Sequence, residues 1–373
     1  MAVIDGWLIV DDQQEERMAF ADRISNPGAG IRVTPVSPSE ARILLLSERN
    51  VPKGVLMDVH LSDAEGELGT GPGLAQDIRL KQRSKDIVGE YPIVRFSRKT
   101  ILAVSVYGDP TSIDLFDLSV DKEEIQESVK LIHSAMLGAE VVYRELSRSK
   151  DGAVDLVRTI TGLTAEQFEE WGHGSFARRM RDGLSTSVHV AALAIFSGLL
   201  EPAGLLIDQN LLKIRLGLNA EQTQDAWALL STDLAEFGFR GAGYEHFPRW
   251  WARGLEDWWD RSFASHHPLA LLSINERFSL LSQKYPGLQK LEMPRGSAGD
   301  RPWRVCSLSL EQDRSDVVPV DPEFAVRITA RSDRPVWTDP QYASAAEAFR
   351  RQDPRSDEND VARLQKLLIR VPQ

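Results

Sequence analysis

The chain has 373 residues, of which 42% are hydrophobic and 27% are charged. This composition excludes a disordered or fibrous protein, and the length allows two or more domains, each with its own core. The single cysteine, Cys306, excludes an intramolecular disulfide framework and a cysteine-rich zinc site. No basic and apolar leader precedes Asp5, and no uncharged apolar run is long enough to span a membrane, so we expect a cytoplasmic protein.

The charge balance argues against nucleic-acid and membrane partners. The net charge is -11, divided into -5 for residues 1–122 and -6 for the remainder. An acidic protein adheres poorly to nucleic acid and to anionic lipid. No recognition helix rich in basic and amide side chains follows a clear helix-turn-helix, so a DNA-binding regulator is the weakest of the functions we consider.

The first 122 residues alternate short apolar runs with amphipathic stretches, which is typical of strands and helices in a parallel α/β sheet. The expected strands cover residues 7–10, 31–36, 55–59 and 93–96, with a fifth ending at 120; the expected helices cover 14–24, 39–49 and 74–82, with a less clear one after 101. Residues 61–73 contain four glycines and a proline, so we expect an irregular loop there.

The period of the apolar residues changes after Lys122. Apolar side chains then recur at alternating intervals of four and three, which predicts a helix over residues 123–146; they are Ile125, Val129, Ile132, Met136, Ala139, Tyr143 and Leu146. Such a helix would be roughly 35 Å long. Packing on the sheet would cover only its first half, so the second half must bury its apolar stripe against the next domain or against a second copy of the chain.

The remainder of the chain is expected to be mainly helical. Residues 164–167 and 219–222 both carry a capping pattern that predicts the start of a helix, and residues 188–200 are apolar nearly all round, as in a buried central helix. Strand-like stretches follow at 303–310 and 324–330, and an amphipathic helix is expected at 359–370. The tryptophans concentrated at 250–259 are interpreted as core.

These elements together predict a doubly wound, five-stranded parallel α/β sheet followed by a mainly α-helical domain with a small α+β C-terminal part. The expected boundaries are 1–122 for the α/β domain, 123–148 for a long connecting helix, 149–299 for the helical output domain and 300–373 for the C-terminal segment.

Polar side chains follow the strands of the predicted sheet. Asp11 and Asp12 follow the first strand, Asp58 ends the third, Ser97 follows the fourth and Lys122 follows the fifth. The carboxyl ends of parallel strands lie at one edge of a sheet, where ligand sites form. Carboxylates gathered there repel one another unless a hard cation is bound, and oxygen ligands suit Mg²⁺. The sequence therefore predicts a magnesium site at this edge.

This arrangement resembles the receiver domain of response regulators in bacterial two-component systems, over about residues 5–135. The resemblance implies that Asp58 accepts a phosphoryl group, and that Asp11, Asp12 and Asp58 hold Mg²⁺ with the backbone carbonyl of His60. It further implies that Ser97 hydrogen-bonds the phosphoryl oxygen and that Lys122 neutralises its charge.

The chain departs from the family's pattern at several positions. The loop after Asp58 is expanded, Arg98 stands where the family prefers a small residue, and Glu123 and Glu124 replace the proline expected after Lys122.

Two classes of function follow from these observations. The first is a two-component signalling protein that receives a phosphoryl group from a histidine kinase or another phosphodonor and relays its state to a helical, protein-binding output domain. The second is a receiver-gated enzyme with a site in residues 151–373. A degenerate receiver that acts as a fixed scaffold, for example in bacterial immunity signalling, is a further alternative. The helix over 123–146 offers a surface for a homodimer.

Overall fold

The structure is a computed structural model that describes residues 5–47, 51–62, 68–97, 114–123, 129–263, 267–295, 297–313, 315–329 and 334–368. The chain forms two compact units. The N-terminal unit comprises residues 1–166, 174–201 and 240–247, and the C-terminal unit comprises residues 167–173, 202–239 and 248–373. The helix expected after residue 101 lies outside the described residues. The same holds for Arg98, Glu124 and Ile125.

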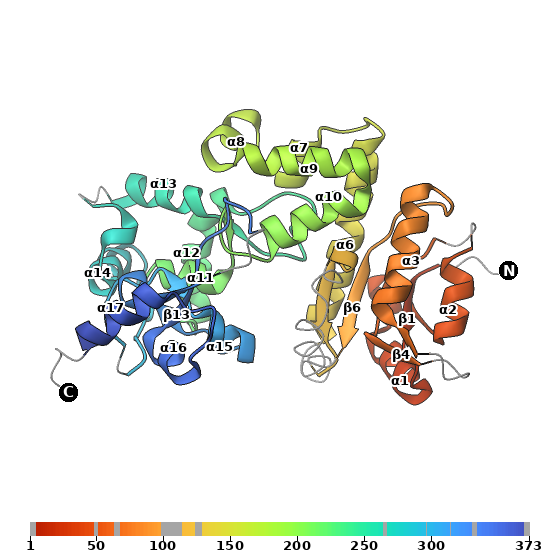
Figure 1. Cartoon of the computed structure of the whole chain (residues 1–373). Helices are drawn as coiled ribbons and strands as arrows, with labels where there is room; N and C mark the ends of the chain where they lie inside the picture. The colour runs from red at the N-terminus through yellow and green to blue at the C-terminus, as the bar shows by residue number, and fades with distance from the viewer. Residues whose placement is uncertain are drawn as a thin grey trace. The chain divides into compact units, whose positions relative to one another are not determined.

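A five-stranded parallel sheet forms the centre of the N-terminal unit, which confirms the predicted fold class (Figure 1). The strand order is β2-β1-β3-β6-β7, with every neighbouring pair parallel; the strands are β1 (Trp7–Val10), β2 (Val33–Val36), β3 (Gly54–Met57), β6 (Ile93–Ser97) and β7 (Leu118–Asp121). Helices α1 (Gln14–Ile24), α2 (Pro38–Leu45) and α3 (Gly71–Ser84) follow β1, β2 and β5 along the chain. Because all strands run the same way, their carboxyl ends meet at one edge.

The described parts of the glycine-rich stretch, residues 61–62 and 68–73, are regular structure, so the prediction of an irregular loop over 61–73 was wrong there. Its ends pair as the antiparallel strands β4 (His60–Ser62) and β5 (Leu68–Thr70), and α3 begins directly at Gly71. The Thr70 side chain caps the helix by accepting a hydrogen bond from the amide of Gly73. Gly71 has a packing role, since a Cβ at this position would lie 1.8 Å from the backbone carbonyl oxygen of Asp58.

The long helix after the sheet is α6 (Val129–Lys150), and its apolar stripe is buried as expected. The residues with almost no exposed surface are Ile132, Met136, Ala139, Tyr143 and Leu146. The cover comes from the same unit: α6 packs against α1, α7 (Leu156–Thr161), α9 (Gly174–Thr186) and α10 (Val188–Ile195). A single chain therefore buries the distal half of the stripe.

The predicted buried helix over 188–200 is also present. It consists of α10, capped by Ser187, and a wider π-helical turn, η3 (Phe196–Leu200), in which the amide of Glu201 donates to the carbonyl of Phe196. Most of its side chains are buried, consistent with an apolar segment without a polar face. Helix α8 (Ala165–Trp171) starts where the first capping pattern predicted.

Helices and two short strands build most of the C-terminal unit. They are β8 (Leu206–Ile207), α11 (Gln209–Arg215), α12 (Gln224–Leu234), β9 (Trp250–Trp251), α13 (Ala252–Phe263) and α14 (Ile274–Lys284). Trp258 and Trp259 are buried in one apolar core, Trp250 packs against that core, and Trp251 is also buried, which confirms the interpretation of these tryptophans as core residues.

The last part of the chain is a small α+β region. Its elements are β10 (Arg304–Val305), α15 (Ser307–Gln312), β11 (Pro319–Val320), β12 (Ala325–Ile328), β13 (Gln341–Ser344), α16 (Ala345–Arg351) and α17 (Glu358–Leu368). Single turns of tight helix complete the described chain at η1 (Pro27–Ala29), η4 (Ala235–Phe237), η5 (Leu269–Leu271) and η6 (Pro322–Phe324).

Two local predictions in the C-terminal unit were wrong. The strand expected over 303–310 ends after β10, because α15 begins at Ser307. The helix expected to open at 219–222 begins only at Gln224. The Gln222 side chain accepts a hydrogen bond from the amide of Gln289 and donates to its carbonyl, so this amide links two loops instead of capping a helix.

In the part of the chain that the structure describes, no helix combines the length and the apolarity that a membrane crossing requires.

Candidate functional site

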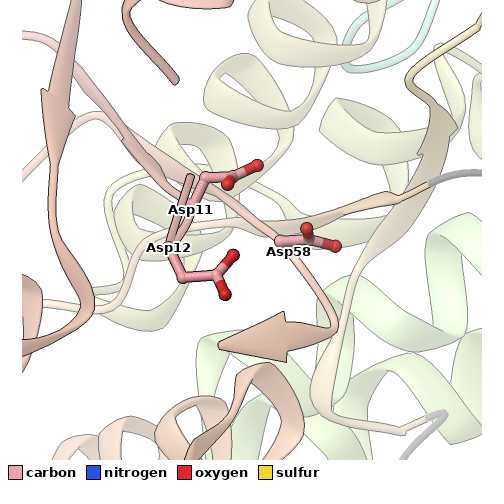
Figure 2. Close-up of side chains that lie close together, drawn as sticks. All are labelled: Asp11, Asp12 and Asp58. Carbon is pink, nitrogen blue, oxygen red and sulfur yellow. The ribbon is translucent and has the colours of Figure 1, made fainter. Parts of the chain in front are cut away.

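Three carboxylates gather at the carboxyl edge of the sheet. Asp11 and Asp12 follow β1, and Asp58 follows β3. One oxygen of each lies within 4.8 Å of the other two, and Figure 2 shows the three side chains around one space. Asp11 and Asp58 are buried, and Asp12 is half-buried. The structure thus brings together the acidic residues that the sequence predicted to share a site.

A buried ammonium group links two of these carboxylates. Lys122 Nζ lies 2.5 Å from Asp11 Oδ2 and 2.6 Å from Asp58 Oδ2, and the lysine side chain is only 4% exposed. Glu16 on α1 places a fourth carboxylate 3.7 Å from the same nitrogen. The ring of Phe96 approaches the ammonium at 5.5 Å, a contact that favours the charged amine.

The pKa shifts of this pair reflect the excess of acidic groups in a buried place. Burial raises the pKa of the Asp11 carboxyl, although hydrogen bonding to Lys122 opposes that rise. Burial alone would lower the pKa of Lys122, but its hydrogen bonds to Asp11 and Asp58 outweigh burial and raise it. The raised pKa of Asp11 indicates that burial weakens its ion pair with Lys122, whereas the raised pKa of Lys122 indicates that this ion pair forms. We conclude that Lys122 is charged, because several carboxylates surround it.

The protein orients two of the carboxylates through its backbone. Asp58 Oδ1 accepts a hydrogen bond of 2.7 Å from the amide of Val59, and Asp11 Oδ1 accepts one of 2.8 Å from the amide of Gln13. The three acidic side chains thus offer oxygen ligands to one point, which is the donor set that Mg²⁺ takes in proteins. The site fits a divalent cation.

Ser97 places a hydroxyl group with free hydrogen-bonding capacity at the end of β6. It ends β6, is fully buried, and its Oγ has no hydrogen-bond partner among the described residues. A buried hydroxyl without a partner is uncommon, because losing its hydrogen bonds to water is unfavourable. Its backbone carbonyl accepts the amide of Lys122 at 3.2 Å, which places the two residues side by side.

The expected role of His60 stays a prediction. The residue begins β4, opposite Thr70 of β5, and its side chain is exposed to solvent. Any contribution to a metal would come from its backbone carbonyl, two residues after Asp58.

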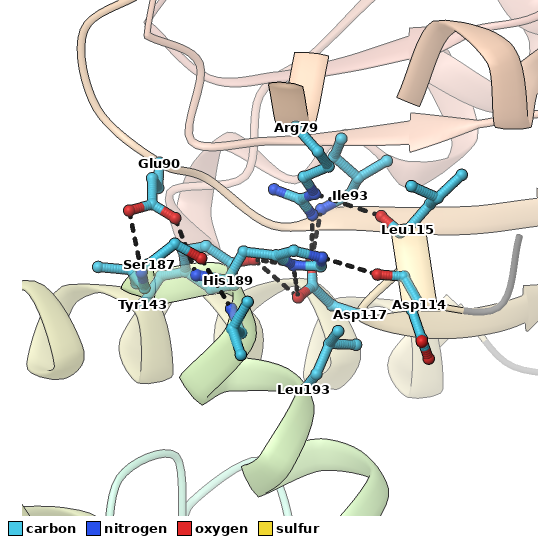
Figure 3. A network of polar contacts seen from close by, with 12 residues as sticks. Arg79, Glu90, Ile93, Asp114, Leu115, Asp117, Tyr143, Ser187, His189 and Leu193 are labelled. Atoms are coloured by element: carbon cyan, nitrogen blue, oxygen red, sulfur yellow. Dashed lines mark hydrogen bonds and ion pairs between the residues drawn. The ribbon is translucent and has the colours of Figure 1, made fainter. Parts of the chain in front are cut away.

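A second buried polar cluster lies at the amino end of β7, and sequence reasoning did not identify it (Figure 3). Its centre is Asp117, whose side chain is fully buried. Asp117 Oδ2 accepts from Arg79 at 2.8 Å and from the amide of Ile93 at 2.8 Å, and Oδ1 accepts from the hydroxyl of Tyr143 at 2.7 Å. Burial opposes ionisation of Asp117, but Arg79 and His189 outweigh it and lower its pKa.

The same cluster ties α10 to the sheet. His189 contacts Asp117 Oδ1 through Nδ1 at 3.1 Å and the backbone carbonyl of Asp114 through Nε2 at 2.8 Å. Both oxygens of Glu90 accept backbone amides at the start of α10, from Val188 and His189 at 2.9 Å each. The cluster is therefore a joint between the sheet and the helices that follow it.

No pattern in the sequence could have revealed this joint. His189 lies 72 residues after its partner Asp117 in the chain. Such pairs are apparent only once the chain has folded.

Comparisons with known proteins give little guidance. No family model matches the chain, and no curated protein matches it. Among solved structures, one titled as a yeast Spc42 trimeric coiled-coil segment fused to another structure is 18% identical, with a TM-score of 0.31. The match covers 42% of this chain and 89% of that one, and such a low TM-score carries no argument about fold or function.

Proposed function

We propose that the N-terminal unit contains the receiver domain of a two-component signalling protein, and that Asp58 accepts a phosphoryl group while Mg²⁺ is bound. The observation that carries this proposal is the composition of the site at the carboxyl edge of the sheet. Asp58 is joined to Lys122 at 2.6 Å, has two more carboxylates within 4.8 Å, and shares its edge with the unpartnered hydroxyl of Ser97.

The proposed chemistry is transfer of a phosphoryl group between two acceptors. A carboxylate oxygen of Asp58 forms a bond to phosphorus, while the bond from phosphorus to the donor's histidine nitrogen or acyl oxygen breaks, and the donor retains that electron pair. A bound Mg²⁺ supplies charge neutralisation for the transferring oxygens. Lys122 stabilises the added negative charge, and Ser97 donates a hydrogen bond to a phosphoryl oxygen.

The strand β7 offers a route for the signal. Lys122 stands directly after its carboxyl end, and Asp117 stands directly before its amino end. A phosphoryl group on Asp58 adds negative charge to the side chain that Lys122 contacts. The four residues of β7 join Lys122 to Asp117, which lies in the polar cluster that contacts α10. The proposed output is a change in how tightly the helices α6 and α10 pack on the sheet, sensed by a protein partner of the helical region.

Intact mass spectrometry after treatment with acetyl phosphate and Mg²⁺ tests the proposal. We expect one added phosphoryl group on the full chain, no addition without Mg²⁺, and no addition to the variant Asp58→Ala. Asp22→Asn is the matched control, because Asp22 is an exposed acid on α1. An unmodified wild-type chain, or equal labelling of Asp58→Ala, would show that the site does not accept phosphate and would favour a fixed scaffold.

A further inference from the structure

Two arginines contact one carboxylate in the C-terminal unit, and a third acts on it electrostatically. Arg215 Nη2 and Arg304 Nη1 lie 2.6 Å and 3.1 Å from the same atom, Asp339 Oδ2. Arg334 also interacts electrostatically with Asp339 and with Arg304. Arg215 ends α11 and Arg304 begins β10. Arg334 and Asp339 lie in the segment before β13, so distant parts of the sequence build the cluster.

The cluster has more positive charge than its acidic neighbours balance. Among the described residues, Asp339 is the one carboxylate that contacts Arg215 and Arg304, and it is the one that acts on Arg334. Glu256 acts on Arg215 only from a longer distance and is itself 3.0 Å from Arg253. Like charges brought together away from water repel one another strongly, since the local dielectric constant is low. Burial lowers the pKa of Arg215 to about 10, which still leaves it charged at neutral pH.

The guanidinium groups also keep unused hydrogen-bond donors. Nε of Arg215, Nε of Arg304 and Nη1 of Arg334 are buried and have no partner among the described residues. A guanidinium has five donors and no acceptor, so only an acceptor group can satisfy them. A single group with several hydrogen-bond acceptor atoms could therefore accept hydrogen bonds from all three arginines.

The surroundings hold the arginines in place. The guanidinium carbon of Arg215 lies 4.7 Å from the ring centre of Trp303, and that of the fully buried Arg277 lies 5.4 Å from it. Arg277 donates to the backbone carbonyls of Arg215 and Pro302. Solvent still reaches the cluster, because the side chains of Arg304 and Asp339 are 17% and 19% exposed.

We propose that this arginine cluster (Arg215, Arg304 and Arg334 around Asp339) binds a small phosphate-type oxyanion, as inorganic phosphate or as the phosphate group of a small metabolite. A tetrahedral oxyanion offers several hydrogen-bond acceptors, and its negative charge would balance the excess positive charge of the arginines. Arginine pairs with phosphate through two parallel hydrogen bonds. The cluster contains only three arginines and one competing carboxylate in a unit of an acidic chain, so a single phosphate group suits it better than a nucleic-acid backbone.

Calorimetric titration of the full chain with inorganic phosphate, at matched ionic strength in chloride, tests the proposal. We expect saturable binding that weakens by at least about tenfold in Arg304→Gln and in Arg334→Gln, because each loses charged hydrogen bonds. Asp339→Asn should bind phosphate more tightly, since it removes the competing carboxylate. Arg350→Gln is the control, because this arginine is 60% exposed and pairs with Glu347 on its own helix.

The outcomes separate the possibilities. Tighter binding of adenosine monophosphate than of phosphate identifies a metabolite as the source of the oxyanion, and equal binding identifies phosphate itself. If Arg304→Gln does not fold, Arg334→Gln and Asp339→Asn still decide the matter. Absence of phosphate binding, equal binding by the arginine variants and Arg350→Gln, or weaker binding by Asp339→Asn would overturn the proposal.

Discussion

The buried cluster around Asp117 leads to a prediction about stability. Asp117→Asn keeps the size of the side chain and removes its charge, which leaves the guanidinium of Arg79, 8% exposed, without its counterion. Removing one partner of a buried ion pair costs about 3–5 kcal/mol, because the other charge stays desolvated. We therefore expect the free energy of unfolding to fall by that amount, a large share of the roughly 5–15 kcal/mol typical of a folded protein.

Urea unfolding with hydrogen exchange on β7 and α10 measures this effect and locates it. Asp77→Asn is the control, because Asp77 pairs with Arg42 at 2.8 Å but both side chains are well exposed; its cost should stay within about 1 kcal/mol. In Arg79→Met with Asp117→Asn, the loss should be smaller than the sum of the two single losses. A loss below about 1 kcal/mol for Asp117→Asn, with additive effects, would refute the view that this pair is charged.

The lowered pKa of Asp117 gives this cluster a defined dependence on pH. A carboxyl whose pKa is lower in the folded than in the unfolded chain stabilises the fold above its unfolded value, about 3.9. That stabilisation is lost as the pH falls from there through the lower folded pKa. The wild-type chain should thus lose more stability on acidification below about pH 3.9 than Asp117→Asn does. Equal slopes for the two proteins would contradict the assignment.

Two further substitutions test the packing, with controls from the chain itself. Gly71→Ala places a methyl group 1.8 Å from the Asp58 carbonyl and should lower the free energy of unfolding by about 1–3 kcal/mol, whereas Gly174→Ala, which meets nothing within 4 Å, should not lower it. Met136→Glu buries a charge on α6 and should lower the melting temperature and open α6 to proteolysis, whereas Leu131→Glu, on the same helix but 61% exposed, should change neither. An unaltered Met136→Glu protein would mean that the apolar stripe of α6 is not buried.

The sequence predicted several helices and strands from their periodicity, and it predicted the polar residues at the ends of the strands. The bounds of β1 and α1 agree with the expected ones, because each is set by a short apolar run or by a local charge pattern. The positions of Asp11, Asp58 and Lys122 were also predictable, since parallel strands bring their carboxyl ends to one edge whatever the details of the loops. The apolar stripe of α6 was equally plain from its spacing.

Local composition misled where contacts with distant residues decide the conformation. Four glycines suggested a loop before α3, yet Gly71 is required by its close approach to the Asp58 carbonyl. Gln222 resembled a capping residue, but its side-chain amide is hydrogen-bonded to the backbone of Gln289, 67 residues later in the chain. In both places a long-range contact outweighs the local preference.

The sequence by itself determined the class of sheet, the buried face of α6 and the group of acids at the sheet edge, because each depends on spacing along one element or on the common direction of parallel strands. Only the tertiary structure decided what covers α6, how Asp117 receives Arg79 and Tyr143, and which arginines surround Asp339. The contacts of Asp117 with Arg79 and Tyr143, and of Asp339 with Arg215, join residues that are 26 to 124 positions apart. The free energy of a buried charge depends on neighbours in space, and no periodicity in the chain records them.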